Sequence, residues 1–225
     1  MSSIPAAVFW DMDGTMVDSE PKWGIATYEM SERLGRRLTP ELREKTIGGS
    51  FANTLRICAE HAGVPDPDYD EQRSILYARM KELLTDLKPN PGIRPLLDQL
   101  EMPCVVCTNT ERELADPCID AVGRQYFVGS ITGDEVPHAK PAPDMYVAAA
   151  EMVGFPPSSC LVFEDSWSGM TAARDAGCQV IGLAEKTPER VVSLIDLHSR
   201  LSLDGVNRDD VCGWFDILYH REELR

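Results

Sequence analysis

Two aspartates, Asp11 and Asp13, directly follow an apolar stretch near the start of the chain. Gly14 comes next and permits the turn that would direct both carboxylates into one cleft. There, one carboxylate can attack as a nucleophile while the other donates and accepts a proton. Like charges so close raise one pKa unless a divalent cation neutralises them, and oxygen-only ligands favour Mg²⁺. A solvated acidic turn is the alternative, and the pair alone does not exclude it.

Three further polar groups argue against that alternative. Thr108 and Asn109 follow a second apolar stretch and supply hydroxyl and amide donors for phosphate oxygens. Lys140 supplies a positive charge that can hold a phosphoryl group. Glu164 and Asp165 follow a third apolar stretch and add carboxylates for the metal. Each group alone is a weak signal, but together they predict a site that binds phosphate and Mg²⁺.

These groups need a scaffold that brings distant parts of the chain together. Short apolar runs, each followed by a polar turn and a helical pattern, occupy residues 6–10, 103–107, 160–163 and 179–183, with a weaker run at 128–132. Continuous apolar strands that alternate with helices are typical of a parallel sheet covered on both faces. In such sheets ligands bind at the carboxyl ends of the strands, where these polar groups lie. The sequence therefore predicts an α/β, Rossmann-like core.

The stretch from residue 20 to 90 differs from the rest of the chain. It has helical patterns without an apolar strand run, its charges nearly balance, and it ends at the turn cluster Lys88–Gly92. We expect a small all-helical cap inserted after the first strand. Residues 19–90 would form this cap, and residues 1–18 and 91–225 would form the catalytic core.

Helix boundaries can also be read from the core sequence. Pro143 and Gly154 fit the start and the end of one helix, and Ser166 fits the N-cap of another. Pro117 lies inside an otherwise helical stretch. We expect a break or kink there, with Asp116 capping the new start.

The polar groups lie in four segments, D-M-D-G-T, C-T-N-T, K-P-A-P-D and F-E-D-S-W-S-G-M. In this order they resemble the four motifs of the haloacid dehalogenase-like hydrolase superfamily. The position of the helical insert resembles the members with a small helical cap. The first and third motifs, with the residues around them, look most similar to the branch that holds β-phosphoglucomutase and the sugar-phosphate phosphatases. The resemblance covers residues 6 to about 190, and no motif follows from Val191 onward.

The resemblance implies a role for each matching residue. Asp11 would attack phosphorus and form an aspartyl-phosphate, and Asp13 would protonate the leaving oxygen and then deprotonate the attacking water. Mg²⁺ would be held by the Asp11 carboxylate, the Asp13 main-chain carbonyl and Asp165. Glu164 would be a further ligand or a partner of the ligands. The phosphoryl oxygens would be held by Thr108, Asn109 and Lys140.

Two positions in the expected cap favour a phosphatase over a mutase. In a gapless match to β-phosphoglucomutase, Phe51 stands where the mutase has a cap arginine, and Trp23 stands where it has a cap histidine. Both replacements remove polar groups that a bisphosphate intermediate needs. We therefore expect a Mg²⁺-dependent phosphatase acting on a small phosphorylated metabolite, such as a sugar phosphate. A sugar-phosphate mutase is the alternative enzyme, and a non-catalytic binding or regulatory protein on the same fold is the alternative of another class.

The loop from Thr46 to Thr54 is the candidate contact between cap and substrate. Its glycines allow close approach of the backbone, and the rings of Phe51 and Trp23 offer an apolar surface. The alternative is that both rings fill the cap's own core. The candidate contact residues are Trp23, Gly48, Gly49, Ser50 and Phe51.

The composition argues against several other kinds of protein. The 225-residue chain has 22 basic and 37 acidic residues, and its net charge of −15 argues against binding to nucleic acid or to an anionic membrane surface. Seven cysteines and an N-terminus unlike a signal peptide favour a cytoplasmic location. Cys104 and Cys107 have metal-site spacing, but no second pair completes a zinc set, so we interpret them as strand residues. No sequence feature sets the oligomeric state or names the metabolite.

Overall fold

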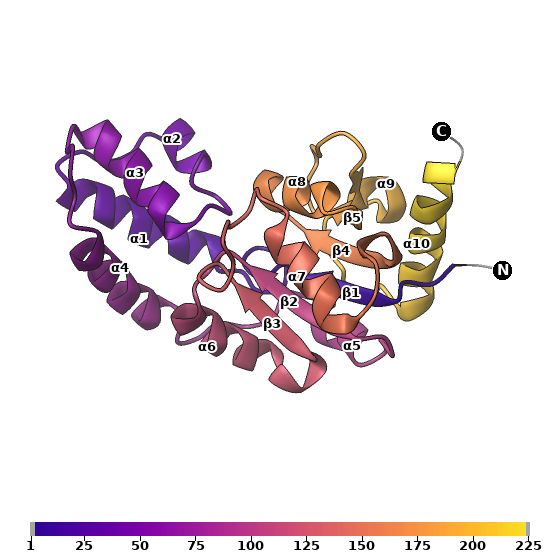
Figure 1. Ribbon diagram of the computed structural model, residues 1–225. Helices are drawn as coiled ribbons and strands as arrows, with labels where there is room; N and C mark the ends of the chain where they lie inside the picture. The colour runs from indigo at the N-terminus through magenta and orange to yellow at the C-terminus, as the bar shows by residue number, and fades with distance from the viewer. Residues whose placement is uncertain (1–2, 224–225) are drawn as a thin grey trace.

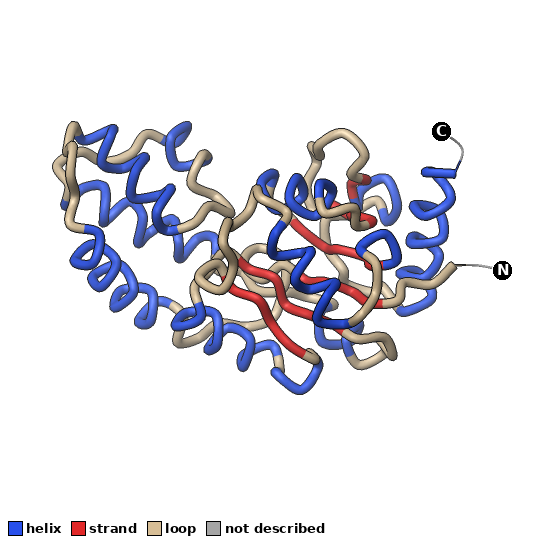
Figure 2. The backbone as a smooth tube through the Cα atoms, in the orientation of Figure 1, coloured by secondary structure: helices blue, strands red, loops and turns tan. Residues whose placement is uncertain are grey.

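A computed structural model describes residues 3–223 of the chain. These residues form a six-stranded sheet in the order β3-β2-β1-β4-β5-β6, in which every neighbouring pair is parallel. The strands, red in Figure 2, are β1 (Ala7–Trp10), β2 (Cys104–Thr108), β3 (Gly129–Thr132), β4 (Cys160–Glu164), β5 (Gln179–Gly182) and β6 (Val192–Ser193). Since β1, β2 and β4 are neighbours, their carboxyl ends meet at one end of the sheet. The predicted parallel α/β core is confirmed.

Helices cover both faces of the sheet, because successive side chains on a strand point to opposite faces. On β1, Val8 and Trp10 belong to one hydrophobic cluster with α5, α6 and α10. Ala7 and Phe9 belong to a second cluster with α7 and α8. The core helices are α5 (Ile93–Leu97), α6 (Arg112–Val122), α7 (Asp144–Val153), α8 (Trp167–Asp175), α9 (Leu194–His198) and α10 (Arg208–Glu223), with short 3-10 turns at Arg124–Tyr126 and Pro157–Ser159.

Four helices lie between β1 and α5, and Figure 1 shows them as a separate group in violet at one end of the molecule. They are α1 (Glu20–Arg33), α2 (Pro40–Glu44), α3 (Phe51–Ala62) and α4 (Tyr69–Leu83). Their inner faces form a third hydrophobic cluster around Met30, Leu55 and Met80, which also includes Leu114 of α6. We call this four-helix segment the helical insert.

Helix α6 runs continuously through Pro117, so the predicted break and the predicted cap by Asp116 are wrong. The Asp116 carboxylate instead accepts hydrogen bonds from Arg112, one turn before it, and from Arg124, beyond the helix end. These two arginines hold the carboxylate on the outside of the helix. The proline is therefore accommodated within one helix.

The predicted ends of two other core helices are confirmed. Helix α7 begins after Pro143 and ends at Gly154, which has a positive φ. The Ser166 hydroxyl accepts a hydrogen bond from the Gly169 N–H and so caps α8. None of the described helices combines the length and the apolar character that a membrane-spanning helix needs.

Candidate active site

Asp11 and Asp13 lie where the chain leaves β1. Asp11 directly follows β1, and its N–H donates to the Phe163 carbonyl of β4. The position of this aspartate is therefore set by both strands. Gly14 then adopts a φ of +83°, which a residue with a Cβ rarely takes. Both aspartates line one cavity beneath the helical insert. This geometry agrees with the predicted turn at Gly14, which brings Asp11 and Asp13 to one cavity.

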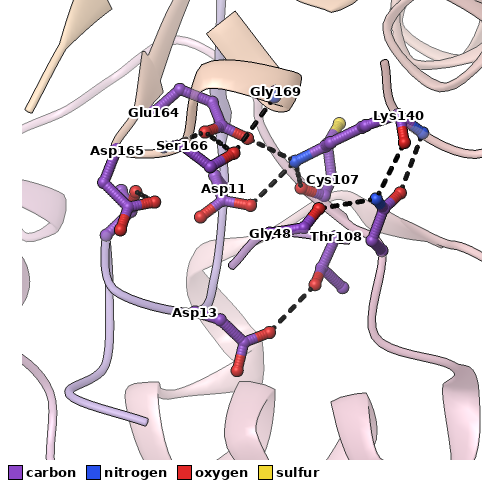
Figure 3. A network of polar contacts seen from close by, with 12 residues as sticks. Asp11, Asp13, Gly48, Cys107, Thr108, Lys140, Glu164, Asp165, Ser166 and Gly169 are labelled. Atoms are coloured by element: carbon purple, nitrogen blue, oxygen red, sulfur yellow. Dashed lines mark hydrogen bonds and ion pairs between the residues drawn. The ribbon is translucent and has the colours of Figure 1, made fainter. Parts of the chain in front are cut away.

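The Lys140 ammonium group is buried and has three acceptors (Figure 3). Its Nζ donates to Asp11 Oδ1 at 2.7 Å, to Glu164 Oε1 at 2.6 Å and to the Cys107 carbonyl at 2.8 Å. Burial alone would lower the pKa of Lys140, but the two carboxylates outweigh it and raise the pKa above its ordinary value. The ammonium group is therefore charged, and it fixes the position of the Asp11 carboxylate.

Both oxygens of the buried Glu164 carboxylate are engaged. Oε1 accepts hydrogen bonds from Lys140 and, at 3.3 Å, from the Tyr146 hydroxyl. Oε2 accepts from the N–H and the hydroxyl of Ser166, both at 2.9 Å. Gly169 makes room for the carboxylate, since a Cβ there would lie 1.6 Å from Oε1. These contacts favour Glu164 as the partner of Lys140 over its alternative role as a metal ligand.

The fit between Gly169 and Glu164 leads to a prediction on stability. Gly169→Ala should lower the free energy of unfolding by about 1–3 kcal/mol, because the buried carboxylate is tied to Lys140 and cannot move aside freely. Gly213→Ala in α10 is the matched control, because a Cβ there meets no atom within 4 Å and should stabilise the helix by about 0.5–1 kcal/mol. Urea unfolding measures both. Equal stability of the two variants would contradict the packing described here.

Three carboxylates lie close together at this end of the sheet. Asp11, Glu164 and Asp165 offer oxygens that all lie within 4.8 Å of one another. Asp11 Oδ2 is buried and has no hydrogen-bond partner among the described residues. Burial, and next the charge of Glu164, raise the pKa of both Asp11 and Asp165 well above the ordinary value. A divalent cation would relieve this repulsion and give Asp11 Oδ2 a partner, so the residues present fit Mg²⁺.

The raised pKa values of Asp11 and Asp165 set the sign of a pH effect. Between the ordinary and the raised pKa values, the metal-free folded state holds protons that the unfolded chain releases, so metal-free stability falls as the pH rises through this window. Mg²⁺ needs the ionised carboxylates and should therefore stabilise more strongly at neutral than at acidic pH.

Thermal unfolding with and without Mg²⁺ measures this effect. At about 100 times its Kd, Mg²⁺ should add about 2.7 kcal/mol at neutral pH and clearly less at about pH 5. Asp165→Asn should lose most of the Mg²⁺ effect, whereas Asp175→Asn, at the exposed end of α8, should keep it. A Mg²⁺ effect that is equal at both pH values would contradict binding to these carboxylates.

Four side chains donate hydrogen bonds to the Asp13 carboxylate. Oδ1 accepts from the Ser19 hydroxyl and, at 2.8 Å, from the Trp23 indole N–H. Oδ2 accepts from Thr110 at 2.7 Å and from Thr108 at 3.2 Å. Ser19 and Trp23 belong to the start of the helical insert, whereas Thr108 is the last residue of β2 and Thr110 follows that strand. The insert and the sheet thus hold the same carboxylate, and the sequence analysis missed the part played by Ser19 and Thr110.

The Asn109 amide joins the helical insert to the core. Its Nδ2 donates to the Gly48 carbonyl at 2.8 Å and to the Lys140 carbonyl at 3.2 Å, while its Oδ1 accepts from the Lys140 N–H at 2.9 Å. The Gly48 carbonyl also accepts from the Ser168 hydroxyl at 3.1 Å. Gly48 has a φ of +66°, and a Cβ there would lie 2.5 Å from Ser166 Cβ. Only glycine allows so close an approach.

The other insert residues that were expected to contact the substrate differ in whether they line the cavity. Trp23, Gly49 and Phe51 line the cavity, but the Phe51 ring also packs edge-on against Tyr77 in the cluster of the insert. Both interpretations made from the sequence therefore describe Phe51. The Ser50 hydroxyl caps α3, and Ser50 is not among the described residues that line the cavity.

A cavity lies between the helical insert and the sheet. Asp11, Asp13 and Lys140 line it on the core side. On the insert side it is lined by residues that the candidate set omitted, among them Glu20, Thr27, Arg43, Leu76 and Tyr77. Glu20 lies beside the first motif, whereas no motif contains Arg43, so the sequence offered little signal for the latter.

Two curated proteins are similar to this chain over most of its length. It is 30% identical to a phosphorylated carbohydrates phosphatase of Thermotoga maritima, with 78% of this chain and 83% of that protein covered. It is 32% identical to a phosphoglycolate phosphatase of Chromobacterium violaceum, with 79% and 84% covered. Both relatives are named for the hydrolysis of a phosphate ester, and both aligned regions exceed two thirds of either chain.

A solved structure and a family profile complete the comparison. The structure of β-phosphoglucomutase from Clostridium difficile has a TM-score of 0.80 and covers 99% of this chain and 100% of that one, and at 15% identity it shows a common fold alone. Residues 5–177 match the profile of the haloacid dehalogenase-like hydrolases and contain all four motif segments. The chain therefore belongs to the haloacid dehalogenase-like hydrolase family.

Proposed function

We propose that this chain is a Mg²⁺-dependent phosphatase that cleaves a small phosphorylated metabolite, such as a sugar phosphate, through an aspartyl-phosphate on Asp11. The observation that carries the proposal is the Asp11 carboxylate itself. Lys140 holds one of its oxygens, while the other is buried without a hydrogen-bond partner among the described residues, at the cavity that Asp13 also lines. A buried oxygen without a partner is costly for stability alone, but a nucleophile or a metal ligand requires one.

The chemistry divides between the two aspartates. Asp11 attacks phosphorus, and the bond from phosphorus to the leaving oxygen breaks. Protonated Asp13 gives that oxygen its proton. Water then transfers a proton to Asp13 and attacks the aspartyl-phosphate at phosphorus, which releases phosphate and restores both side chains. Asp13 is placed to serve both steps because it lines the same cavity as Asp11.

Positive charge stabilises the transferring group in this proposal. Mg²⁺, when bound, supplies charge that offsets the charge of the phosphoryl oxygens. Asp11, Asp165 and the main-chain carbonyl of Asp13 would hold it, and Glu164 would act through Lys140. Thr108 and Asn109, at the end of β2, and the Lys140 ammonium group would position the phosphoryl oxygens.

We propose that residues 19–90 act as a cap on a core of residues 1–18 and 91–225. Two contacts support this division: Trp23 of the insert donates to Asp13, and Asn109 of the core donates to the Gly48 carbonyl. Closure of the insert would exclude bulk water from the cavity and strengthen the attraction between metal and phosphate.

A small-molecule partner and a cytoplasmic location complete the proposal. The net charge of −15 disfavours nucleic acid and anionic membranes as partners. All seven cysteines are free thiols, as is usual in a reducing compartment.

The structure of the insert favours a phosphatase over a mutase. A mutase must hold a second phosphate, which calls for a basic or strongly polar group in the cap. The Phe51 ring packs against Tyr77, and the polar edge of Trp23 is occupied by Asp13. Neither position offers a positive charge, and Arg43, the basic residue of the insert that lines the cavity, is paired with Glu20. The relatives named as phosphatases support the same choice.

Hydrolysis of p-nitrophenyl phosphate and of a panel of sugar phosphates by the purified chain tests the proposal. We expect release of phosphate with Mg²⁺ and none after treatment with EDTA, with activity restored by added Mg²⁺. Absence of hydrolysis under all conditions would support the non-catalytic alternative. Interconversion of glucose 1-phosphate and glucose 6-phosphate that needs glucose 1,6-bisphosphate, with little release of phosphate, would support the mutase.

A further inference from the structure

A buried ion pair lies in the part of the cavity that the insert contributes. Arg43 of α2 donates from one guanidinium nitrogen to Glu20 Oε2 at 3.1 Å and from another to the Thr46 hydroxyl at 2.9 Å. The Arg43 side chain is 11% exposed and that of Glu20 is 23% exposed. Arg43 Nε is buried without a hydrogen-bond partner among the described residues. Both residues line the cavity, on the insert side, opposite Asp11 and Lys140.

This pair determines the charge that a leaving group meets. Among the described residues that line the cavity, Lys140 and Arg43 are the cationic ones. Lys140 is already paired with Asp11 and Glu164, and Arg43 is paired with Glu20. An anionic group on the leaving side would therefore find each cation already neutralised. The anionic group would also be repelled by the carboxylates of Glu20 and Asp13. Burial raises the pKa of Glu20, and the negative charge of Asp13 raises it further.

The uncharged part of the insert wall is mixed in character. Thr27, Thr46 and Thr54 line it together with the rings of Trp23 and Tyr77. Hydroxyl groups and ring faces suit a leaving group that carries hydroxyls on a carbon skeleton. A carboxylate of similar size would lose its hydration here without gaining a free cation.

We propose that the Glu20–Arg43 pair selects uncharged, hydroxyl-bearing leaving groups and rejects leaving groups with a carboxylate or a second phosphate. This inference rests on the proposed phosphatase activity and narrows its substrate class. Glu20 neutralises Arg43 and accepts hydrogen bonds from substrate hydroxyls, while Arg43 donates to them. Alone, Arg43 would attract the anionic group that the pair rejects, so the neutrality of the pair is the selective feature.

Two substrates that differ in one group test the proposal directly. Glycerol 3-phosphate and 3-phosphoglycerate have the same carbon skeleton, but a hydroxymethyl group in the first is a carboxylate in the second. The wild-type chain should prefer glycerol 3-phosphate in kcat/KM by at least about 10-fold. Glu20→Gln leaves Arg43 unpaired and should lower this preference by at least about 10-fold, whereas Arg43→Gln should raise it.

The double variant Glu20→Gln with Arg43→Gln is the control, because it restores a neutral pair without ions. Its preference should return to within about threefold of the wild-type value, even if its overall rate is lower. A purely structural role for the pair predicts that kcat/KM falls equally for both substrates in every variant, and that result would overturn the proposal. So would a wild-type preference for 3-phosphoglycerate. Failure to hydrolyse any phosphate ester, p-nitrophenyl phosphate included, would instead refute the proposed phosphatase function.

Discussion

Asp11→Asn is expected to lower the rate of Mg²⁺-dependent phosphate release by at least about 10⁴-fold, because an amide cannot form the aspartyl-phosphate. The fold should be retained. The amide oxygen can still accept the hydrogen bond from Lys140, and Lys140 keeps Glu164 as its charged partner.

Hydrolysis of p-nitrophenyl phosphate and thermal unfolding measure the two parts of this expectation. Asp18→Asn is the matched control, because Asp18 lies on the same segment but is exposed, and it should keep nearly full activity. The unfolding midpoint of the Asp11→Asn protein should lie within about 5 °C of the wild-type value. Activity within about tenfold of wild type would show that another group attacks phosphorus.

Lys140→Met is expected to lower the free energy of unfolding of the metal-free protein by about 3–5 kcal/mol, since it leaves the buried carboxylates of Asp11 and Glu164 without their counter-charge. Phosphatase activity should also fall by at least about 10³-fold, because the Asp11 carboxylate loses the group that positions it. The deficit in stability should shrink as the pH falls, because burial and the charge of Glu164 raise the pKa of Asp11, and protonation of Asp11 removes the repulsion.

Urea unfolding at two pH values and a phosphatase assay measure these effects. Lys81→Met is the matched control, because Lys81 pairs with Glu113 in an ion pair in which both side chains are about half exposed, and its loss should change stability by less than about 1 kcal/mol. A Lys140→Met protein as stable as the Lys81→Met protein would show that the ion pairs of Lys140 with Asp11 and Glu164 do not stabilise the active site.

The sheet and the core side of the site could be predicted because they follow from local patterns. Each buried strand is a short apolar run that ends at a polar turn, and parallel strands place their carboxyl ends together. Asp11, Asn109 and Asp165 therefore meet although more than fifty residues separate each from the next. Strand β6 has only two residues, which is too short for a strand pattern, so the sequence did not indicate it.

The insert side of the cavity could not be predicted, because it depends on how helices pack against one another. Glu20 and Arg43 lie on different helices, and their ion pair forms only when α1 and α2 pack together. The four donors to Asp13 likewise come from two places, the start of the insert and the carboxyl end of β2 with the turn after it. The continuous course of α6 through Pro117 was not predicted either, because the local rule for proline places a break or kink there.

Chemical trapping during turnover can identify the residue that becomes phosphorylated. Wild-type protein turning over p-nitrophenyl phosphate with Mg²⁺ would be quenched in acid and reduced with borohydride, which converts an aspartyl-phosphate to homoserine, and the peptides would be analysed by mass spectrometry. We expect homoserine at position 11 alone, and none when the substrate is omitted. Homoserine at position 13, or continued release of phosphate with Asp11 never modified, would contradict it.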